Sequence, residues 1–155
     1  FQKINFSINA KLLIIGYGPN KNIIKNFINE NKLNKKVKIL NYQNNPYKFI
    51  KRADILVLSS IFEGLPNVLL EAIVLNKFVI STNCPTGPSE ILDNGKGGLL
   101  FKVGDHKELE KKIKYYLSNK KVCNKKIRYA KKRLNRFDFN YNLNKYNYIV
   151  QKHLQ

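Results

Sequence analysis

The chain has 155 residues and carries 29 lysines and arginines against 10 acidic residues, for a formal net charge of +19. This length predicts a single domain, residues 1–155, with a core that needs neither a metal nor a disulfide. The two cysteines, Cys84 and Cys123, form no CxxC motif, no apolar run is long enough to cross a bilayer, and the amino terminus lacks a signal-peptide pattern. A cytoplasmic protein without a metal site is therefore expected.

Short apolar runs rich in β-branched residues alternate with helical patterns along the chain. Strands are predicted at 11–16, 37–40, 54–60, 78–82 and 98–101. Helices or helical turns are predicted at 20–32, 46–52, 67–76, 88–92 and 105–118, and two more at 121–135 and about 140–153. Because the strands are apolar nearly throughout, they are expected to be parallel and covered on both faces. The predicted fold class is α/β with a doubly wound parallel sheet, on which the helices of 121–155 pack back.

The turn GYGP follows the first predicted strand. Gly16 and Gly18 permit a tight turn, and Pro19 suits the start of a helix. A dinucleotide-binding GxGxxG motif needs a glycine at position 21, where Lys21 stands, so that motif is not met. A ligand-contacting turn and a plain strand-to-helix connection both stay open.

The segment SSIFEGLPNVLLEA, residues 59–72, places two carboxylates around the start of a helix. The helix is apolar enough to predict burial on all sides, which makes Glu71 in its middle costly unless it has a partner. Pro66 is expected at the first helical position, and the free N–H groups of that turn favour anionic or hydroxyl-rich ligands. Glu63 and Glu71 are then expected to converge on one crevice and to accept hydrogen bonds from sugar hydroxyls. The alternative is structural, with Glu63 as a cap and Glu71 in an ion pair with a lysine.

A third candidate site is CPTGPSEIL, residues 84–92. Its prolines and Gly87 predict a stiff loop, and Ser89 and Glu90 open a helix. Loop stiffness and a charge that complements the helix dipole are the structural alternative. His106 and His153 have no serine, cysteine or acidic partner at a suggestive spacing, so both are expected at the surface.

The most basic block, residues 120–136, has an apolar stripe of Cys123, Ile127, Ala130 and Leu134 with lysines and arginines opposite. It predicts an amphipathic helix docked on the core, whose basic face can also contact acidic lipid headgroups. No aromatic side chains interleave these cations as base stacking requires, so no nucleic acid partner is expected. Because the excess charge is mostly lysine spread along the chain, a bias in composition is the favoured explanation for it.

The string SSIFEGLPNVLLEAIVLNKFVIST, followed by PTGPSEIL and GGLLF, resembles the carboxyl-terminal, donor-binding domain of GT-B glycosyltransferases of family 4. Such enzymes transfer a sugar from a nucleotide donor with retention of anomeric configuration. The resemblance runs from KLLIIGYGP to the last helix, and it implies a Rossmann-like half of a GT-B enzyme. Its central motif, two glutamates separated by seven residues, is matched by Glu63 and Glu71. Asn83 departs from the aspartate that relatives often have.

The resemblance also implies a role for each matching residue. Glu63 would be the catalytic residue and hold hydroxyls of the transferred sugar, and Glu71 would bind the ribose. Further substrate contacts are implied at Gly64, Leu65, Pro66 and Asn67, at Gly16 and Gly18, and at Asn41 and Tyr42 in the loop that cradles the base. The implied donor is a nucleotide sugar such as a UDP-sugar. No cofactor or metal is implied, because positive side chains and helix-end amides neutralise the diphosphate.

In this family a first strand-turn-helix unit with an arginine and a lysine, and an acceptor-binding domain, precede the segment that begins at Phe1. The opening FQKINFSINAK is expected to be the end of that first helix. The chain alone is therefore expected to bind a nucleotide sugar weakly and to transfer nothing. The implied acceptor is a glycan or a lipid-linked glycan of the cell envelope, with peripheral contact at the inner face of an anionic membrane. The alternative is a non-catalytic nucleotide-binding or interaction module.

Overall fold

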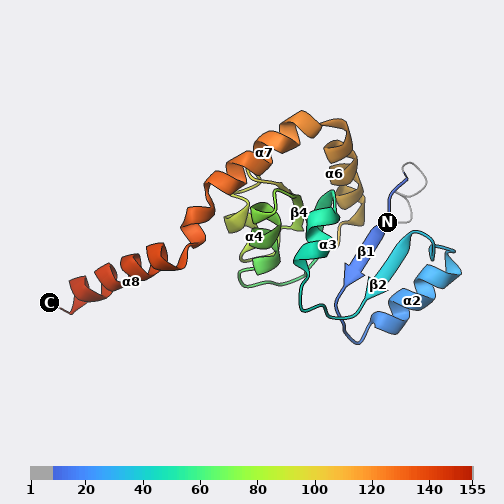
Figure 1. Ribbon diagram of the computed structural model, residues 1–155, viewed down its shortest axis with the longest axis horizontal. Coiled ribbons are helices and arrows are strands. Elements are labelled where there is room, and N and C mark those ends of the chain that lie inside the picture. Colours follow the sequence, from blue (N-terminus) through green and yellow to red (C-terminus); the bar gives the residue numbers. More distant parts are fainter. Residues whose placement is uncertain (1–8, 155) are drawn as a thin grey trace. The chain divides into compact units, whose positions relative to one another are not determined.

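The computed structural model describes residues 9–154, which fall into two compact units, residues 1–49 and 50–155 (Figure 1). The first unit contains β1 (Leu12–Ile15), α2 (Lys21–Glu30) and β2 (Val37–Leu40). The two strands pair in parallel, with Leu12 opposite Val37. The core of this unit is formed by Ile28, Leu33 and Val37, against which apolar residues of both strands pack. Most of the helix end expected in FQKINFSINAK lies outside the described residues.

The second unit contains three strands, and α3 (Tyr47–Arg52) leads into it across the division. Its elements in chain order are β3 (Ile55–Leu58), α4 (Asn67–Val74), β4 (Phe78–Thr82), α5 (Pro88–Ile91), β5 (Leu99–Phe101), α6 (His106–Ser118), α7 (Lys120–Lys132), the 3-10 helix η1 (Leu134–Phe137) and α8 (Phe139–His153). The strands lie in the order β3-β4-β5, and both pairs are parallel. Their carboxyl ends therefore share one edge of the sheet.

The predicted fold class is confirmed, and the bounds of each predicted strand and helix lie within about three residues of those expected. The described strands form two parallel sheets, of two and three strands, instead of the single sheet expected from the sequence. That residues 1–155 act as a single domain stays a prediction.

Both faces of the three-stranded sheet are covered, as the apolar strands predict. Successive side chains of a strand point to opposite faces, and in β4 Phe78 and Ile80 join a core with Tyr116 of α6 and Cys123 of α7. Val79, between them, joins a different core that contains buried residues of α4 and α5. Every residue of β4 is buried, so this central strand is the base on which the loops at its carboxyl end are built.

The two helical segments after α6 differ in how they pack. α7 buries Cys123 and Ala130, whereas no described residue of α8 is buried. The helix predicted at 121–135 ends at Lys132, and η1 follows. The guanidinium of Arg136 in η1 donates to the carbonyls of Glu90 and Ile91 at 3.3 and 3.4 Å, which fixes this tighter turn against α5. Docking of α8 on the sheet stays a prediction.

The loops after β3 and β4 pack against each other at the carboxyl edge of the sheet. Gly87 has a φ of +83°, and a Cβ built on it would lie 2.0 Å from the carbonyl oxygen of Gly64 and 2.5 Å from Cδ of Pro66. The hydroxyl of Thr82 donates to the carbonyl of Ser60 at 2.7 Å. The first loop therefore rests directly on the backbone of the second.

Asp93 joins α7 to the turn after α5. Its oxygen Oδ2 accepts a hydrogen bond from the hydroxyl of Tyr129. The same oxygen lies 3.5 Å from Nε of Arg133 and 3.7 Å from Nζ of Lys96. The hydrogen bond from Tyr129 is the first cause that lowers the pKa of Asp93, with the neighbouring cations adding to it. Asp93 itself has a φ of +47°, a conformation that aspartate and asparagine tolerate better than most residues.

Replacing Gly87 by alanine should destabilise the second unit, because the added methyl group meets the Gly64 backbone and the left-handed backbone becomes strained. Gly104→Ala is the matched control, since its φ is +79° but no atom lies within 4 Å of the added Cβ. In urea unfolding, the free energy of unfolding should fall by about 1 kcal/mol for Gly104→Ala. For Gly87→Ala it should fall by about 2 kcal/mol or more in addition to that loss. Equal losses for the two variants would contradict the close packing of the loops.

Replacing Asp93 by asparagine should lower the free energy of unfolding at neutral pH. A carboxyl group whose pKa is lowered on folding stabilises the protein above its unfolded pKa of about 3.9, and this contribution is lost as the pH falls through the folded pKa. The difference between wild type and variant should therefore be largest near pH 7 and shrink below about pH 4. Tyr129→Phe should remove much of the same pH-dependent stabilisation, because it removes the hydrogen bond to Asp93. If the difference in free energy of unfolding between wild type and Asp93→Asn does not change with pH, the ionised carboxylate is not the source of the stabilisation.

Candidate functional site

Glu63 lies in the loop that leaves the carboxyl end of β3, and it is held at both its side chain and its backbone. The Ser60 hydroxyl donates to Oε1 of Glu63 at 2.6 Å, and the Thr86 hydroxyl donates to the Glu63 carbonyl. Its side chain is half-buried. Within residues 9–154 the second carboxylate oxygen, Oε2, has no hydrogen bond or ion pair, so it is free to accept from a ligand.

The amino-terminal end of α4 carries no side-chain cap. Pro66 is buried and occupies the position before the helix, which begins at Asn67, so the expectation of Pro66 as the first helical residue is wrong by one position. The reason is its extended backbone, with ψ of +93°. The amide of Leu69 donates to the Pro66 carbonyl at 2.9 Å, and the amides of Asn67 and Val68 precede the first intrahelical bond. Such amides, with the helix dipole behind them, favour negative charge.

Glu71 lies on the side of α4 that faces away from the core. The buried residues of α4 are Leu69, Ala72 and Ile73, and two residues of helix turn the side chain by about 200°. The prediction that α4 is buried on all sides is therefore wrong, and Val74 on the same outer side is 55% exposed. Glu71 is half-buried, so its carboxylate avoids the full cost of burial and yet is not in open solvent.

The structural alternative for Glu71, an ion pair with a lysine, is not seen in the described part of the chain. The four ion pairs found there involve Asp93, Glu108 and Glu110. Glu71 is thus a half-buried carboxylate without a cation among residues 9–154. That Glu63 and Glu71 converge on one crevice stays a prediction.

The third candidate segment, residues 84–92, supports the loop of Glu63. Cys84 and Pro88 are buried, and Gly87 contacts the Gly64 backbone. α5 is a single turn that begins at Pro88 directly after Gly87. The segment forms the loop and helix start predicted for it, and it packs on the neighbouring loop. That the loop is stiff stays a prediction. The backbone amide of Asn83, the departure from the family pattern, donates to the Phe101 carbonyl at 2.7 Å.

Thr82 and Thr86 position the site, although neither is predicted to do so from the sequence. Both hydroxyls donate to carbonyls of the Glu63 loop, at Ser60 and at Glu63. A signal was available for Thr82, because a hydroxyl at the end of a strand that begins with three apolar residues is expected to be buried and then needs an acceptor. Which carbonyl accepts could not be read from the sequence.

The remaining predicted residues lie in the first unit, at the carboxyl ends of its two strands. Gly16 has a φ of +143°, and its amide donates to the Leu40 carbonyl at 3.0 Å. Gly18, Asn41 and Tyr42 are exposed, with Tyr42 at 67%. The two groups of predicted residues thus fall on separate units. Within the first unit the GYGP turn and the loop after β2 are neighbours.

Two further side chains shape that loop. Nζ of Lys21 donates to Oδ1 of Asn41, and the Gln43 amide donates to the carbonyls of Asn41 and Tyr42 at 3.1 Å each. In the sequence Lys21 is notable only because it breaks the glycine motif. The structure shows that it tethers the start of α2 to the loop after β2.

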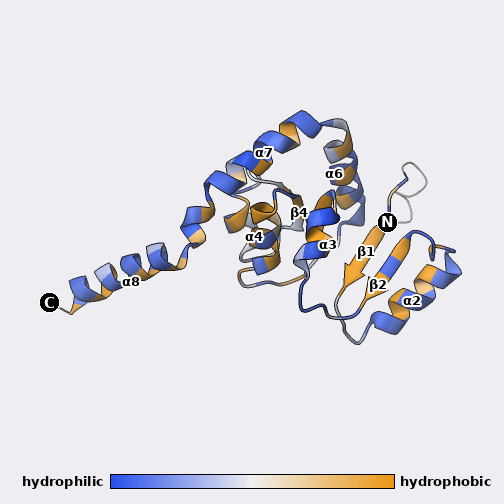
Figure 2. Cartoon of the chain, viewed as in Figure 1, coloured by the Kyte–Doolittle hydropathy of each residue, from blue (hydrophilic) through white to orange (hydrophobic). Residues whose placement is uncertain are grey.

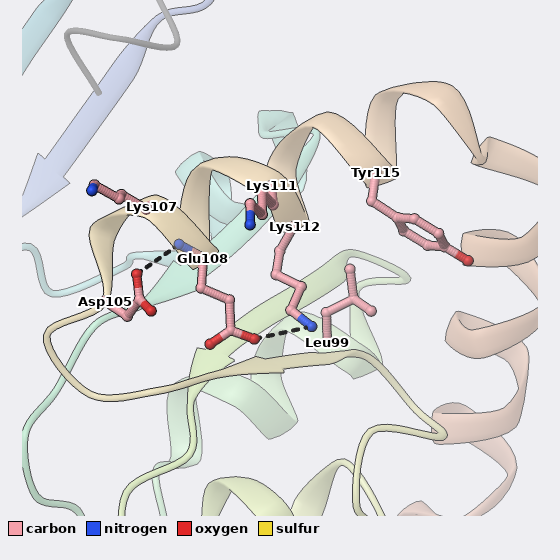
Figure 3. A pocket seen from close by; sticks show the side chains of 7 residues that line it. All are labelled: Leu99, Asp105, Lys107, Glu108, Lys111, Lys112 and Tyr115. Atoms are coloured by element: carbon pink, nitrogen blue, oxygen red, sulfur yellow. Dashed lines mark hydrogen bonds and ion pairs between the residues drawn. The ribbon is translucent and has the colours of Figure 1, made fainter.

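A hollow of about 660 Å³ lies along α6, and none of the predicted site residues lines it (Figure 3). Its acidic groups already have partners: Asp105 accepts from the Glu108 amide at 2.8 Å, and Glu108 accepts from the Lys102 amide at 2.8 Å. These backbone hydrogen bonds are the first cause that lowers the pKa of each carboxyl group. The carboxylates thus close the turn between β5 and α6, and we assign the hollow no role in the candidate site.

Cysteine and metal chemistry have little support among the described residues. Both cysteines are free and buried, and burial raises the pKa of the Cys123 thiol, which makes it a poor nucleophile. Residues 9–154 contain no cluster of three histidine, cysteine or acidic side chains suited to a metal ion. In the same residues, we find no helix with the length and apolarity required to span a bilayer.

Comparison with known proteins places the chain in a family. The profile described as "Glycosyl transferases group 1" matches residues 1–133. An uncharacterized glycosyltransferase of Methanocaldococcus jannaschii is 51% identical over 84 residues, which cover 54% of this chain and 21% of that protein. The N-acetylgalactosamine-N,N'-diacetylbacillosaminyl-diphospho-undecaprenol 4-alpha-N-acetylgalactosaminyltransferase of Campylobacter jejuni is 32% identical over 128 residues, which cover 83% of this chain and 35% of that protein.

A solved structure agrees with the fold. The crystal structure of Anabaena Alr3699/HepE in complex with UDP superposes with a TM-score of 0.81 at 18% identity, covering 97% of this chain and 44% of that one. The chain thus spans between about a fifth and less than half of the length of these proteins. Since the family profile extends over most of its length, the chain belongs to the group 1 glycosyl transferases, as its resemblance to the donor-binding domain of GT-B enzymes predicts.

Proposed function

We propose that this chain is the donor-binding domain of a retaining glycosyltransferase that moves a sugar from a nucleotide sugar to a glycan or lipid-linked acceptor. The observation that carries the proposal is the state of Glu63. In a chain of this family its carboxylate is fixed by Ser60 at the carboxyl end of β3, with one oxygen left without a partner in the described residues. In open α/β sheets that edge is where ligands bind.

In this proposal the loop of Glu63 binds the sugar and the diphosphate. The free oxygen of Glu63 accepts a hydrogen bond from a sugar hydroxyl, which is a donor suited to a carboxylate. The backbone of Gly64, Leu65 and Pro66 lies beside it, and the uncapped amides at Asn67 supply partial positive charge to the diphosphate. Stabilising the leaving group in this way needs no metal, and metal-independent transfer is part of the proposal.

Glu71 is proposed to bind the ribose of the donor. Its half-buried carboxylate has no cation among residues 9–154, so both oxygens are available for the two vicinal hydroxyls of a ribose. In the first unit, Asn41 and Tyr42 are proposed to contact the base, with Gly16 and Gly18 near the donor. The UDP in the Anabaena complex supports a uridine nucleotide as the first donor to test.

The acceptor and the place of reaction are proposed from the relatives. The Campylobacter relative is named for a substrate linked to diphospho-undecaprenol, which supports a lipid-linked acceptor for the present chain as well. We therefore propose that the protein acts in cell-envelope glycan synthesis from the cytoplasmic side, with peripheral contact to the membrane. Membership of family 4 and retention of configuration rest on the resemblance of the Glu63 and Glu71 motif.

Replacing Glu71 by glutamine should weaken binding of both UDP and a UDP-sugar by about 10- to 100-fold, because charge-assisted hydrogen bonds to the ribose, about 1.5–3 kcal/mol each, are lost. Chemical-shift titration with UDP-, GDP- and ADP-sugars identifies the base that binds, and the variant is then compared with that nucleotide. Glu30→Gln, an exposed acid of α2, is the matched control and should bind as wild type does. Unchanged affinity in Glu71→Gln would remove the ribose contact from the proposal.

Replacing Glu63 by glutamine should give a different pattern, because Glu63 contacts the sugar and not the nucleotide. The amide oxygen of glutamine can still accept from Ser60, so the loop is expected to keep its shape. The affinity for UDP should stay within about twofold of wild type, while the affinity for the UDP-sugar should fall about 10-fold or more.

The same samples test whether the chain acts alone. UDP release from the UDP-sugar in the presence of a glycan acceptor should be absent, in keeping with the prediction that the isolated chain transfers nothing. Equal loss of UDP and UDP-sugar binding in Glu63→Gln would contradict its assignment to the sugar. Absence of any nucleotide-sugar binding by wild type would contradict the donor-binding function itself.

A further inference from the structure

Apart from Lys120, whose Nζ lies 3.5 Å from the centroid of the Tyr116 ring, the cations of α7 form two sets with different surroundings. The inner set holds the helix to the second unit: Nζ of Lys126 donates to the Gly95 carbonyl at 2.5 Å, Nζ of Lys131 to Oδ1 of Asn76 at 2.9 Å, and Arg133, which ends the helix, lies 3.5 Å from Asp93. These side chains fix the orientation of α7 on the second unit, and so they also fix which face of the helix is exposed.

The outer set is a row of four cations that we call the α7 stripe: Lys121, Lys125, Arg128 and Lys132. All four are exposed, and within residues 9–154 none has a hydrogen bond, ion pair or ring contact. Their spacing of four, three and four residues puts them on one face of the helix, over a length of about 16 Å. α7 contains no acidic residue, and it is largely blue in Figure 2.

In the neighbouring helix α6, by contrast, two lysines form ion pairs with glutamates of the same helix. In α6, Lys112 and Lys114 lie 3.3 and 2.7 Å from Glu108 and Glu110, one turn earlier. Four cations along one face of α7 without such partners repel one another, and this costs stability unless an anion neutralises them. α7 has no acidic residue one turn from these cations, so no intrahelical ion pair neutralises them.

We propose that the α7 stripe binds the phosphates of anionic lipid headgroups and so holds the protein at a membrane surface. A flat array of phosphates matches a straight row of cations on a rigid helix. Nucleic acid fits less well, because the one aromatic residue of α7, Tyr129, is half-buried and bonded to Asp93, and no ring is left on the stripe for base stacking. The choice of lipid also rests on the proposed function, since a lipid-linked acceptor requires contact with a bilayer.

The experiment is flotation of the protein with phosphatidylcholine vesicles, with and without phosphatidylglycerol. Wild type should bind only the anionic vesicles and be released by salt. Changing Lys121, Lys125, Arg128 and Lys132 together to glutamine keeps good helix formers on the exposed face. If each cation raises the affinity for anionic vesicles about fivefold, the variant should bind these vesicles several hundredfold more weakly than wild type.

A charge-matched control separates the stripe from the net charge of the protein. Changing Lys25, Lys35, Lys38 and Lys51 to glutamine also removes four exposed cations without described partners, but from other elements. This control should bind anionic vesicles within a few-fold of wild type. Equal losses in the two variants, or no binding of wild type to anionic vesicles, would overturn the proposal.

Two further measurements complete the test. Circular dichroism and titration with a UDP-sugar should be the same for the stripe variant and wild type, because α7 carries none of the proposed donor contacts. Loss of donor binding together with vesicle binding would point to a structural role for the stripe and overturn the proposal. Tighter, stripe-dependent binding of a DNA or RNA duplex than of vesicles would replace lipid by nucleic acid. If wild type binds vesicles but no nucleotide sugar, the proposed function fails and the lipid site stands.

Discussion

The close approach of two loop backbones at the carboxyl edge of the three-stranded sheet is the constraint on which the candidate site depends. Gly87 leaves no room for a side chain beside the Gly64 carbonyl, so the loops after β3 and β4 can pack only with glycine at this position. Thr82 and Thr86 add hydrogen bonds across the same contact. Because β4 is buried along its whole length, this support is rigid. This contact determines the positions of Glu63 and of the start of α4.

The acidic residues of this basic chain have separable roles. Asp93, Asp105 and Glu108 each accept from a tyrosine or a backbone amide, and their pKa values are lowered accordingly. Asp138 caps α8 by accepting from the Tyr141 amide at 2.9 Å. In contrast, the carboxylate of Glu63 has one described partner and that of Glu71 has none in residues 9–154. Half-buried carboxylates that neither cap a helix nor join two elements are the ones for which a ligand is the better explanation.

The cations show the same division. Lysines that donate to a carbonyl or an amide hold α7 in place, and the four of the α7 stripe have no acceptor in the described chain. A protein with a donor site at the sheet edge and a cationic helix face would have two surfaces for two anions, a nucleotide diphosphate and a lipid phosphate. Positive charge would bind both anions. Backbone amides at the start of α4 would bind the diphosphate, and exposed side chains of α7 would bind the lipid phosphate.

The sequence by itself determined the elements, the parallel strands and the family. Apolar runs and helical periods are local patterns, so the segments expected at 78–82 and 105–118 agree closely with β4 and α6, and the two glutamates of the motif are also local in the chain. Only the tertiary structure decided which face of α4 carries Glu71, that Thr82 and Thr86 hold the Glu63 loop, and which lysines of α7 point inward. The hydrogen bonds of Thr82, Thr86, Lys126 and Lys131 join residues that are 22 to 55 positions apart. No periodicity encodes such a pairing, because it depends on how the strands and helices pack and not on the order of residues within any one of them.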